Sequence, residues 1–319
     1  MKQTLTLWLL NLLQASLMLL VAPLLAGIVR KFKARLQNRR GASLLQPYQD
    51  LRKLFSKESL FADNSSWIFR TAPVVIFTAT LLAASIVPII VVDLPSAMIA
   101  DVIAMTALLA LARFWIALAA MDIGTAFGGM GASREMTFSA LAEPAMLMGV
   151  FVMSLGAHST NLSTMVHFAL NLHHLHPSVA FALAALLMVS VAENGRIPID
   201  NPTTHLELTM IHEAMILEYS GRHLALIEWA AQIKLLLFAS LIISLFAPWG
   251  IAETIGLLPI LIALGCWFAK IILLAAAVAM LESALAKIRL FEVPNYLFTA
   301  FVLAFLGMLV HYILEVGVQ

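Results

Sequence analysis

The sequence of 319 residues contains a single cysteine, Cys266. One thiol excludes a disulfide framework, a cysteine-ligated iron–sulfur cluster and a cysteine-rich structural zinc site. Most of the nine histidines fall in polar connecting segments, which argues against bis-histidine haem ligation. The sequence also lacks a glycine-rich phosphate-binding loop, so nothing in it indicates ATP-driven transport. We therefore expect this chain to carry no redox cofactor of its own.

Charged residues are also scarce, at 12% of the chain, whereas hydrophobic residues make up 62%. A soluble domain has about 25% charged and about 45–50% apolar residues. A water-soluble fold could not bury so much apolar surface. The formal net charge of +1 gives no basic surface for nucleic acid. The composition therefore predicts an integral membrane protein.

Long apolar segments divide the chain into membrane spans, each of about 20 residues. The sequence predicts eight, near residues 4–29, 67–92, 98–120, 136–157, 178–195, 224–247, 255–282 and 295–316. The first is interpreted as a retained span, because it is longer than a signal h-region and basic residues follow it directly. We expect an all-α integral membrane fold of eight transmembrane helices plus short interfacial and loop helices, forming one domain over residues 1–319.

The basic residues orient these spans. Fifteen of the 19 Lys and Arg residues fall in the loops on one side, and only Lys2 lies on the other. Loops rich in Lys and Arg stay in the cytoplasm. Both termini are therefore predicted to lie outside.

Three basic residues, Arg113, Lys234 and Lys270, fall within predicted spans, and Glu143 lies within the fourth. Buried charges are costly in a membrane and usually face a bundle interior or a hydrated path. Lys234, Lys270 and Glu143 lie deep in their spans, which favours such a role, and acids and bases on several helices suit proton relay. Arg113 lies toward the inner end of its span, so snorkelling to the interface is an alternative for it, as for Glu228 and Glu282.

The inner loop 195–223 begins with two prolines that exclude a continuous helix. Thr204 and Glu207 then form a capping box, which predicts a helix to about Glu218. The pair His212-Glu213 lacks the second histidine of a zinc protease. The acids and histidines of this loop can pass protons at the membrane surface, and they are Glu207, Glu213, Glu218, His205 and His212. The alternative is that they belong to a solvated loop helix.

The first inner loop, 30–66, has an amphipathic pattern over residues 43–57 that predicts a helix lying in the interface. Its basic residues either touch lipid headgroups or dock a soluble partner. On the outer side, His173, His174 and His176 could bind a metal, although no carboxylate or cysteine accompanies them. We interpret that segment as a neutral polar loop.

Four motifs occur in an order that resembles subunit 1 of respiratory complex I and its relatives in membrane-bound nickel–iron hydrogenases. They are Arg39-Arg40-Gly41 followed by Gln46 to Lys53, Gly131 to Glu135 followed by Glu143, Ala192 to Asp200, and Glu218-Tyr219-Ser220-Gly221. The loop after Asp200 reads Asn-Pro-Thr-Thr-His-Leu-Glu, where complex I members usually carry Pro-Glu-x-Glu. This departure resembles the energy-converting hydrogenase branch and argues against quinone use.

The resemblance implies a multi-pass subunit of a bacterial or archaeal cytoplasmic membrane that anchors a peripheral redox arm. The expected partners are hydrogenase large and small subunits, or an equivalent arm, and antiporter-like membrane subunits. The nickel–iron centre and iron–sulfur clusters would lie on those partners. The residues expected to serve ion translocation and coupling are Arg134, Glu143, Glu193, Asp200, Glu207, Glu213, Glu218, Lys234 and Lys270.

Residues expected to dock the peripheral arm or to line a quinone-like chamber are Arg39, Arg40, Asp50, Arg52, Lys53 and Arg196. The leading hypothesis is a non-redox subunit that couples electron transfer to proton or sodium movement. One alternative is the quinone-channel subunit of a complex I-like quinone oxidoreductase. Another is a stand-alone secondary transporter, which explains the charges within spans but not the long basic inner loops.

Overall fold

The computed structural model describes residues 2–62, 64–172, 176–200, 210–252 and 256–315. This part of the chain contains helices and two isolated β-bridges, with no named strand. The long helices are α1 (Lys2–Leu36), α3 (Trp67–Ile86), α4 (Val102–Asp122), α5 (Ala126–Ala157), α7 (Pro177–Glu193), α9 (Gly221–Phe246), α10 (Leu257–Ala284) and α11 (Val293–Val310). The shorter elements are α2 (Gln46–Ser56), α6 (Leu162–Leu170), α8 (His212–Ile216), the 3₁₀ turns Pro95–Ile99 and Leu290–Glu292, and a π turn at His311–Glu315.

Seven of the described helices are long and apolar enough to cross a membrane: α1, α3, α4, α5, α9, α10 and the helical segment Leu290–Leu314 that contains α11. Helix α7 is apolar but has 17 residues. At about 1.5 Å per residue it is about 26 Å long, slightly short of a hydrocarbon core of about 30 Å. The all-helical fold is therefore confirmed for the described residues, with seven helices long and apolar enough to cross a membrane and one shorter apolar helix where eight spans were predicted.

The predicted boundaries were wrong at several ends. Helix α1 continues to Leu36, because its basic residues 30–35 are compatible with helix once they leave the apolar layer. Helix α5 begins at Ala126, ten residues before the predicted span, where the Thr125 hydroxyl accepts a hydrogen bond from the Gly128 amide. Helix α3 ends at Ile86, just before the Val87-Pro88 sequence.

The helix predicted to end near Glu218 comprises only His212–Ile216 among the described residues. The capping box Thr204/Glu207, like His173 and His174, lies outside the described residues. The amphipathic helix of the first inner loop is confirmed as α2, which buries Pro47 and Leu51.

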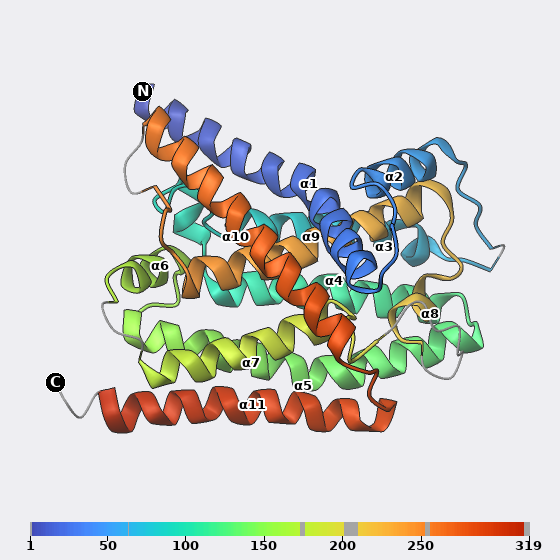
Figure 1. Cartoon of the computed structure of the whole chain (residues 1–319). Coiled ribbons are helices and arrows are strands. Elements are labelled where there is room, and N and C mark those ends of the chain that lie inside the picture. Colours follow the sequence, from blue (N-terminus) through green and yellow to red (C-terminus); the bar gives the residue numbers. More distant parts are fainter. Residues whose placement is uncertain (1, 63, 173–175, 201–209, 253–255, 316–319) are drawn as a thin grey trace.

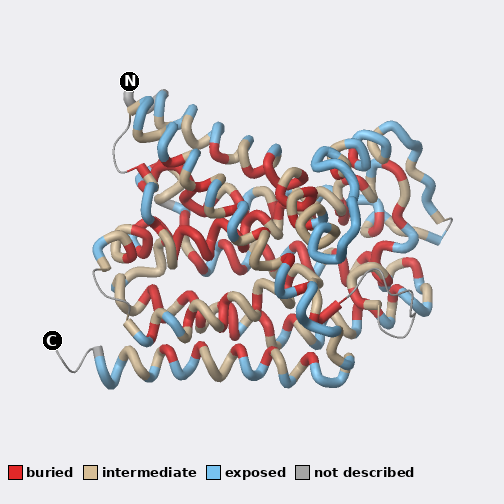
Figure 2. The backbone as a smooth tube through the Cα atoms, viewed as in Figure 1, coloured by how far each residue is buried: buried red, intermediate tan, exposed pale blue. Residues whose placement is uncertain are grey.

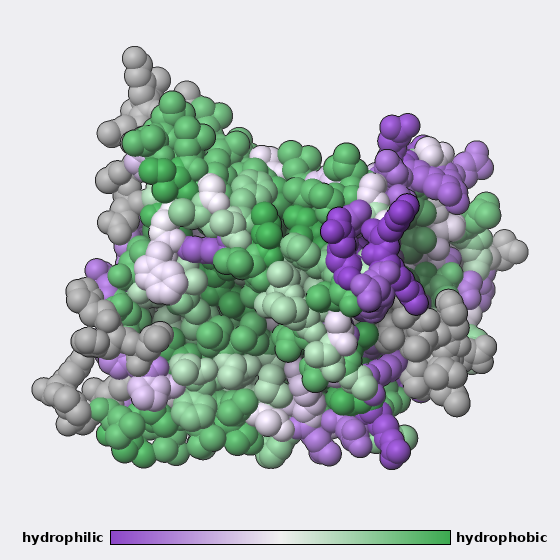
Figure 3. Space-filling view, viewed as in Figure 1, coloured by the Kyte–Doolittle hydropathy of each residue, from purple (hydrophilic) through white to green (hydrophobic). Residues whose placement is uncertain are grey.

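Figure 1 shows the helices running roughly side by side in layers. Helices α5, α7 and α11 pack together along one edge, α3, α4 and α9 form the middle, and α1 lies on the opposite edge. Helix α10 packs on α1 and runs diagonally across the front of the bundle. The N-terminal end of α1 and the C-terminal end of α11 lie at the end of the bundle opposite to α2 and α8. The charged surface seen in Figure 3 gathers at the α2 and α8 end, while most of the remaining face is apolar.

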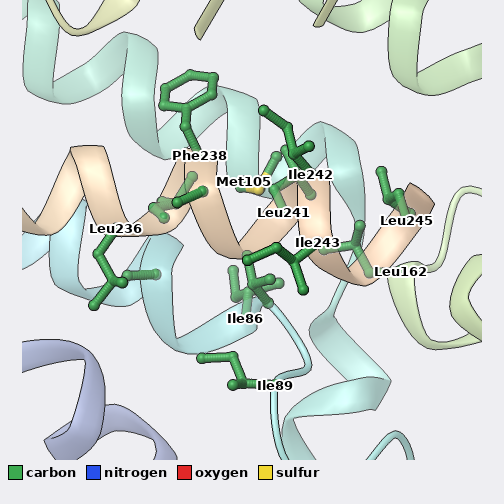
Figure 4. Packing of buried hydrophobic residues seen from close by; sticks show 14 of the residues in the cluster. Ile86, Ile89, Met105, Leu162, Leu236, Phe238, Leu241, Ile242, Ile243 and Leu245 are labelled. Carbon is green, nitrogen blue, oxygen red and sulfur yellow. The ribbon is translucent and has the colours of Figure 1, made fainter. Parts of the chain in front are cut away.

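Helix α9 occupies the centre of the bundle. In the apolar 18-residue stretch that defines α9 as a candidate span, 72% is buried inside the protein. The corresponding share is 17% for α10 and 22% for the segment containing α11. Its side chains Leu236, Phe238, Leu241 and Leu245 pack in the core shown in Figure 4, and Figure 2 shows burial concentrated in the middle layer. Lys234, midway along α9, is accordingly only 24% exposed.

Candidate functional site

Arg113 lies at the centre of a buried ion cluster that joins three long helices. Its guanidinium, on α4, donates from Nη2 to both carboxylate oxygens of Glu193 at 2.6 Å and from Nη1 to Oε1 of Glu143 at 2.7 Å. Glu193 is the last residue of α7, and Glu143 lies midway along α5. The Arg113 and Glu193 side chains are only 6% and 3% exposed. Such charge-assisted contacts are the strong kind, and a planar guanidinium suits two carboxylates at once.

Two further charges complete the cluster. The Arg113 Nε atom lies 3.7 Å from Oε1 of Glu135, two turns before Glu143 on α5. The Lys234 ammonium, on α9, lies 3.8 Å from Oε2 of Glu193. Three carboxylates against two cations leave a formal charge of −1 when all are ionised. One added proton would neutralise the cluster.

Cavities lie on both sides of this cluster. The larger, about 650 Å³ of space not filled by atoms and partly open to the surroundings, borders α5, α7 and α11 and includes Asp200 in its lining. A second lies among α3, α4 and α9, where Thr80 and Leu109 contribute to it. Both cavities are lined by Ala231 and by four ionisable side chains: Arg113, Glu135, His212 and Lys234. They form a charged wall between two spaces inside the bundle.

The inner loop closes one end of the cluster. Asp200 is buried, and its carboxylate lies 3.3 Å from the Lys287 ammonium. The Arg134 guanidinium donates to the carbonyl oxygen of Met210 at 2.8 Å, which holds the segment before α8 against α5. Burial, reinforced by the positive charge of Lys234, lowers the pKa of His212 from 6.5 to about 4, although Asp200 acts in the opposite direction. His212 is therefore a neutral imidazole at neutral pH.

A separate ion cluster lies between α1, α10 and the loop after α7. Glu282, which is 5% exposed, accepts from the Lys33 ammonium and from Nη1 of Arg196, both at 2.8 Å. These contacts attach the start of the inner loop to two helices.

The two inner loops are joined through the motif that begins at Glu218. The Tyr219 ring stacks on Phe69 with centroids 3.9 Å apart, and its hydroxyl donates to the Phe69 carbonyl at 2.9 Å. The Ser220 hydroxyl accepts from the Leu60 amide at 2.8 Å. Gly221 adopts φ +53°, and a Cβ there would lie 2.3 Å from the Glu58 carbonyl oxygen. This motif therefore fixes the first inner loop to the start of α9.

The structure brings together some of the residues predicted for coupling and separates others. Glu143, Glu193 and Lys234 belong to the Arg113 cluster, and Asp200 lines its larger cavity. Arg134 precedes Glu135 on α5, and Glu213 follows His212 on α8. Glu218 is exposed in a turn, and Glu207 lies outside the described residues.

Lys270 lies far from this cluster, toward the opposite end of α9. Its ammonium donates to the carbonyl oxygens of Ala247 and Trp249, which follow that end of the helix. It therefore satisfies carbonyls left free where α9 ends.

The residues predicted for docking gather at the end of the bundle that contains α2 and α8. Arg39, Arg40, Arg52 and Lys53 are exposed, and Asp50 lies 3.8 Å from Arg30. Arg196 instead contacts Glu282. The described residues contain no group of three or more His, Cys, Asp or Glu side chains placed to hold a metal ion.

Sequence reasoning missed the central role of Arg113 and the contribution of Glu135. The snorkelling interpretation of Arg113 was wrong, because its side chain is buried midway along α4 and meets carboxylates from α5 and α7. Glu282 is likewise buried in ion pairs. A signal was present in the sequence: Glu135 and Glu143 lie at the start of the predicted fourth span, and Glu193 lies at the end of the fifth. These acids are candidate partners for an arginine within a neighbouring span.

Comparison with known proteins places the chain in a family. A family model described as NADH dehydrogenase matches residues 9–313. The chain is 35% identical over 300 residues to formate hydrogenlyase subunit 4 of Escherichia coli, covering 93% of this chain and 96% of that one. It is 34% identical over 295 residues to hydrogenase-4 component C of the same organism, with 92% of each covered.

More distant relatives extend the comparison. A subunit of the NADH-quinone oxidoreductase of Anaplasma phagocytophilum is 27% identical over 238 residues, covering 68% of this chain and 69% of that one. A chain in the structure of the membrane-bound sulfane sulfur reductase, an archaeal respiratory membrane complex, matches with a TM-score of 0.82 at 20% identity, covering 95% of this chain and 99% of that one. The chain belongs to the NADH dehydrogenase family of complex I subunit 1 type, on the side of formate hydrogenlyase subunit 4 and hydrogenase-4 component C.

Proposed function

We propose that this chain is the non-redox anchor and coupling subunit of a membrane-bound hydrogenase-type oxidoreductase. It links electron transfer in a peripheral arm to translocation of protons or sodium ions. Two relatives named for formate hydrogenlyase and hydrogenase-4 support this branch, since they align over more than nine-tenths of their length. The quinone-named relative aligns over 69% of its length at lower identity. The nickel–iron centre and iron–sulfur clusters belong to partner subunits in this proposal.

The observation that carries the proposal is the Arg113 cluster. Charges buried in a membrane bundle are retained for function more often than for stability, because removing them from water is costly. Here a cluster with a formal charge of −1 lies between two cavities and next to the inner loop that contains Asp200 and His212. A displacement of that loop would change the electrostatic environment of the cluster.

The geometry of the cluster supports proton transfer through it. Neutral His212 can accept a proton from the inner loop and release it toward Glu135 or Glu193 across the larger cavity, which all three residues line. Protonation of Glu143 would weaken its contact with Arg113, while the guanidinium would remain paired with Glu193. The Glu143 side chain is 34% exposed, the most exposed of the three carboxylates. We therefore assign Glu143 as the exit toward neighbouring antiporter-like subunits.

In its membrane, the chain has eight spans with both termini outside the cytoplasm of a bacterium or archaeon. Helix α7 is counted as the eighth span, since it packs between α5 and α11 along the same direction. The loops 30–66 and 195–223 then form one cytoplasmic docking surface, supported by the contacts of Tyr219, Ser220 and Gly221 that join them. The exposed basic residues of α2 would meet the peripheral arm.

Purification under mild conditions tests membership of a complex. Co-purification of iron–sulfur subunits with a tagged chain supports the proposal, whereas a chain that is isolated alone and transports ions would favour a secondary transporter. Hydrogen evolution by vesicles free of quinone separates the proposal from a quinone-channel subunit. Loss of quinone-dependent activity on changing Asp50, Arg134 or Asp200 would favour the quinone alternative.

Replacing Glu143 with Gln tests the exit. We expect lower ion pumping with assembly retained, because the amide keeps a hydrogen bond to Arg113 but cannot carry the proton. Glu228→Gln, a change on α9 outside the cluster, is the matched control. Undiminished pumping by Glu143→Gln would contradict the assignment.

A further inference from the structure

An apolar groove lies next to the larger cavity beside the Arg113 cluster, and Asn194 lines both. About 450 Å³ of space not filled by atoms, part of it open to the surroundings, lies there among α1, α7, α9 and α10. Its apolar lining includes Leu25, Val29, Leu187, Phe238, Leu274 and Val278. Helix α10 packs on α1 and α9, whereas α7 packs on α5, α11 and α9. Helix α9 is therefore the floor of this lateral groove, and α7 and α10 are its walls.

The sequence spacing extends the groove along the helices and gives it one charged end. On α1, Leu25 and Val29 are followed at the same interval of four by Lys33. On α10, Leu274 and Val278 are followed at that interval by Glu282. Residues four apart share a helix face, so each apolar stripe ends in a charged residue at the inner end of its helix. The eight-residue stripes are about 12 Å long.

The charged end carries an excess of positive charge. Lys33 and Arg196 both donate to Glu282 at 2.8 Å, so two cations share one carboxylate. Their side chains are 26% and 21% exposed. An ammonium has three donors and a guanidinium five, so each cation can also donate to a phosphate oxygen. Arg196 lines the groove itself and links its apolar part to this cluster.

We infer that the lateral groove binds an anionic phospholipid of the inner leaflet. One acyl chain lies against Leu274 and Val278, and the phosphate lies against Lys33 and Arg196. Basic pockets between helices on the cytoplasmic side suit anionic headgroups, whereas a neutral amphiphile would gain nothing from the excess charge. The inference uses the proposed membrane orientation but does not depend on ion coupling.

Photo-crosslinking of the purified complex tests this site. Phosphatidylglycerol with a photoreactive group in its acyl chain should label residues of α7, α9 or α10 that line the groove, as mapped by peptide mass spectrometry. Phosphatidylcholine with the same chain should label them less. Val278→Trp fills the groove and should reduce labelling at least fivefold. The matched control on the same helix is Leu273→Trp, at a side chain that is 71% exposed, and it should leave labelling unchanged.

A second variant tests the charged end without filling the groove. Lys33→Gln removes the excess positive charge and should lower the apparent affinity for phosphatidylglycerol about fivefold while leaving that for phosphatidylcholine unchanged. Equal labelling by both lipids, labelling that survives Val278→Trp, or displacement by a quinone analogue but not by unlabelled phosphatidylglycerol would each overturn the inference. Because the readout is lipid contact, it can fail while ion pumping by the complex is normal, and the reverse.

Discussion

Substitutions at the two ends of the Arg113–Glu193 ion pair should have unequal effects. The intact cluster has three carboxylates and two cations, with a formal charge of −1. Arg113→Gln changes this to −2 and leaves Glu193 with Lys234, at 3.8 Å, as its remaining cation. Glu193→Gln brings the charge to zero and leaves Arg113 paired with Glu143 at 2.7 Å. Removing the arginine therefore leaves uncompensated buried charge, whereas removing this carboxylate does not.

The expected magnitude follows from that difference. Breaking a buried pair so that a charge remains unpaired costs about 3–5 kcal/mol. We expect this for Arg113→Gln, as a fall of about 5–10 °C in apparent Tm. Glu193→Gln should cost about 1–2 kcal/mol, since its amide can still accept from the guanidinium. The double variant restores the charge to −1 and should be more stable than Arg113→Gln alone.

Fluorescence-detected size-exclusion chromatography after heating measures these differences in detergent. The four proteins form a double-mutant cycle, in which a coupling energy isolates the pair from its surroundings. Lys270→Gln, on a helix outside the cluster, controls for loss of any intramembrane cation. Equal destabilisation by Arg113→Gln and Glu193→Gln, with no rescue in the double variant, would refute charge balance as the principle that holds the cluster together.

Three further outcomes follow from the inner loops. Gly221→Ala should destabilise the protein by about 2–3 kcal/mol, because the residue has a positive φ and the new Cβ would clash with the Glu58 carbonyl. Gly195→Ala, at φ +56° but with nothing within 4 Å of the new Cβ, should cost about 1 kcal/mol. Equal thermal shifts for the two variants would contradict the clash. Tyr219→Phe should lose about 0.5–1.5 kcal/mol with its hydrogen bond but keep the aromatic stack, so a Tm as low as that of Tyr219→Ala would argue against the stacking contribution. His212 has a folded-state pKa of about 4, below its usual 6.5, so the unfolded chain binds its proton more readily and stability falls as pH drops from 6.5 toward 4. His212→Asn should flatten that decline in Tm, and an unchanged pH profile would contradict the burial of a neutral imidazole.

The sequence predicted the membrane class and most helices because apolar length depends only on local composition. It predicted α2 from its amphipathic spacing and predicted intramembrane functions for Glu143 and Lys234 from their depth. Helix ends were less predictable. The polar start of α5 is helical because Thr125 caps it and α8 packs against it. Hydropathy alone predicts neither the cap nor the packing.

The pairing of charges could not be predicted from sequence. Arg113 lies 30 residues from Glu143 and 80 from Glu193, and only the packing of α4 against α5 and α7 brings them together. Lys234 and Lys270 look equivalent in sequence, each deep in an apolar run. In the structure one meets a carboxylate and the other meets backbone carbonyls, because α9 is central and α10 peripheral.

The ratio of ions translocated to electrons transferred tests the central claim most directly. The complex containing Glu193→Gln would be reconstituted in sealed vesicles, with electron transfer and ion uptake recorded on the same preparation. If the Arg113 cluster couples the two processes, electron transfer should continue while the ratio falls well below that of the unaltered complex. A ratio equal to that of the unaltered complex, at an equal rate of electron transfer, would contradict the account.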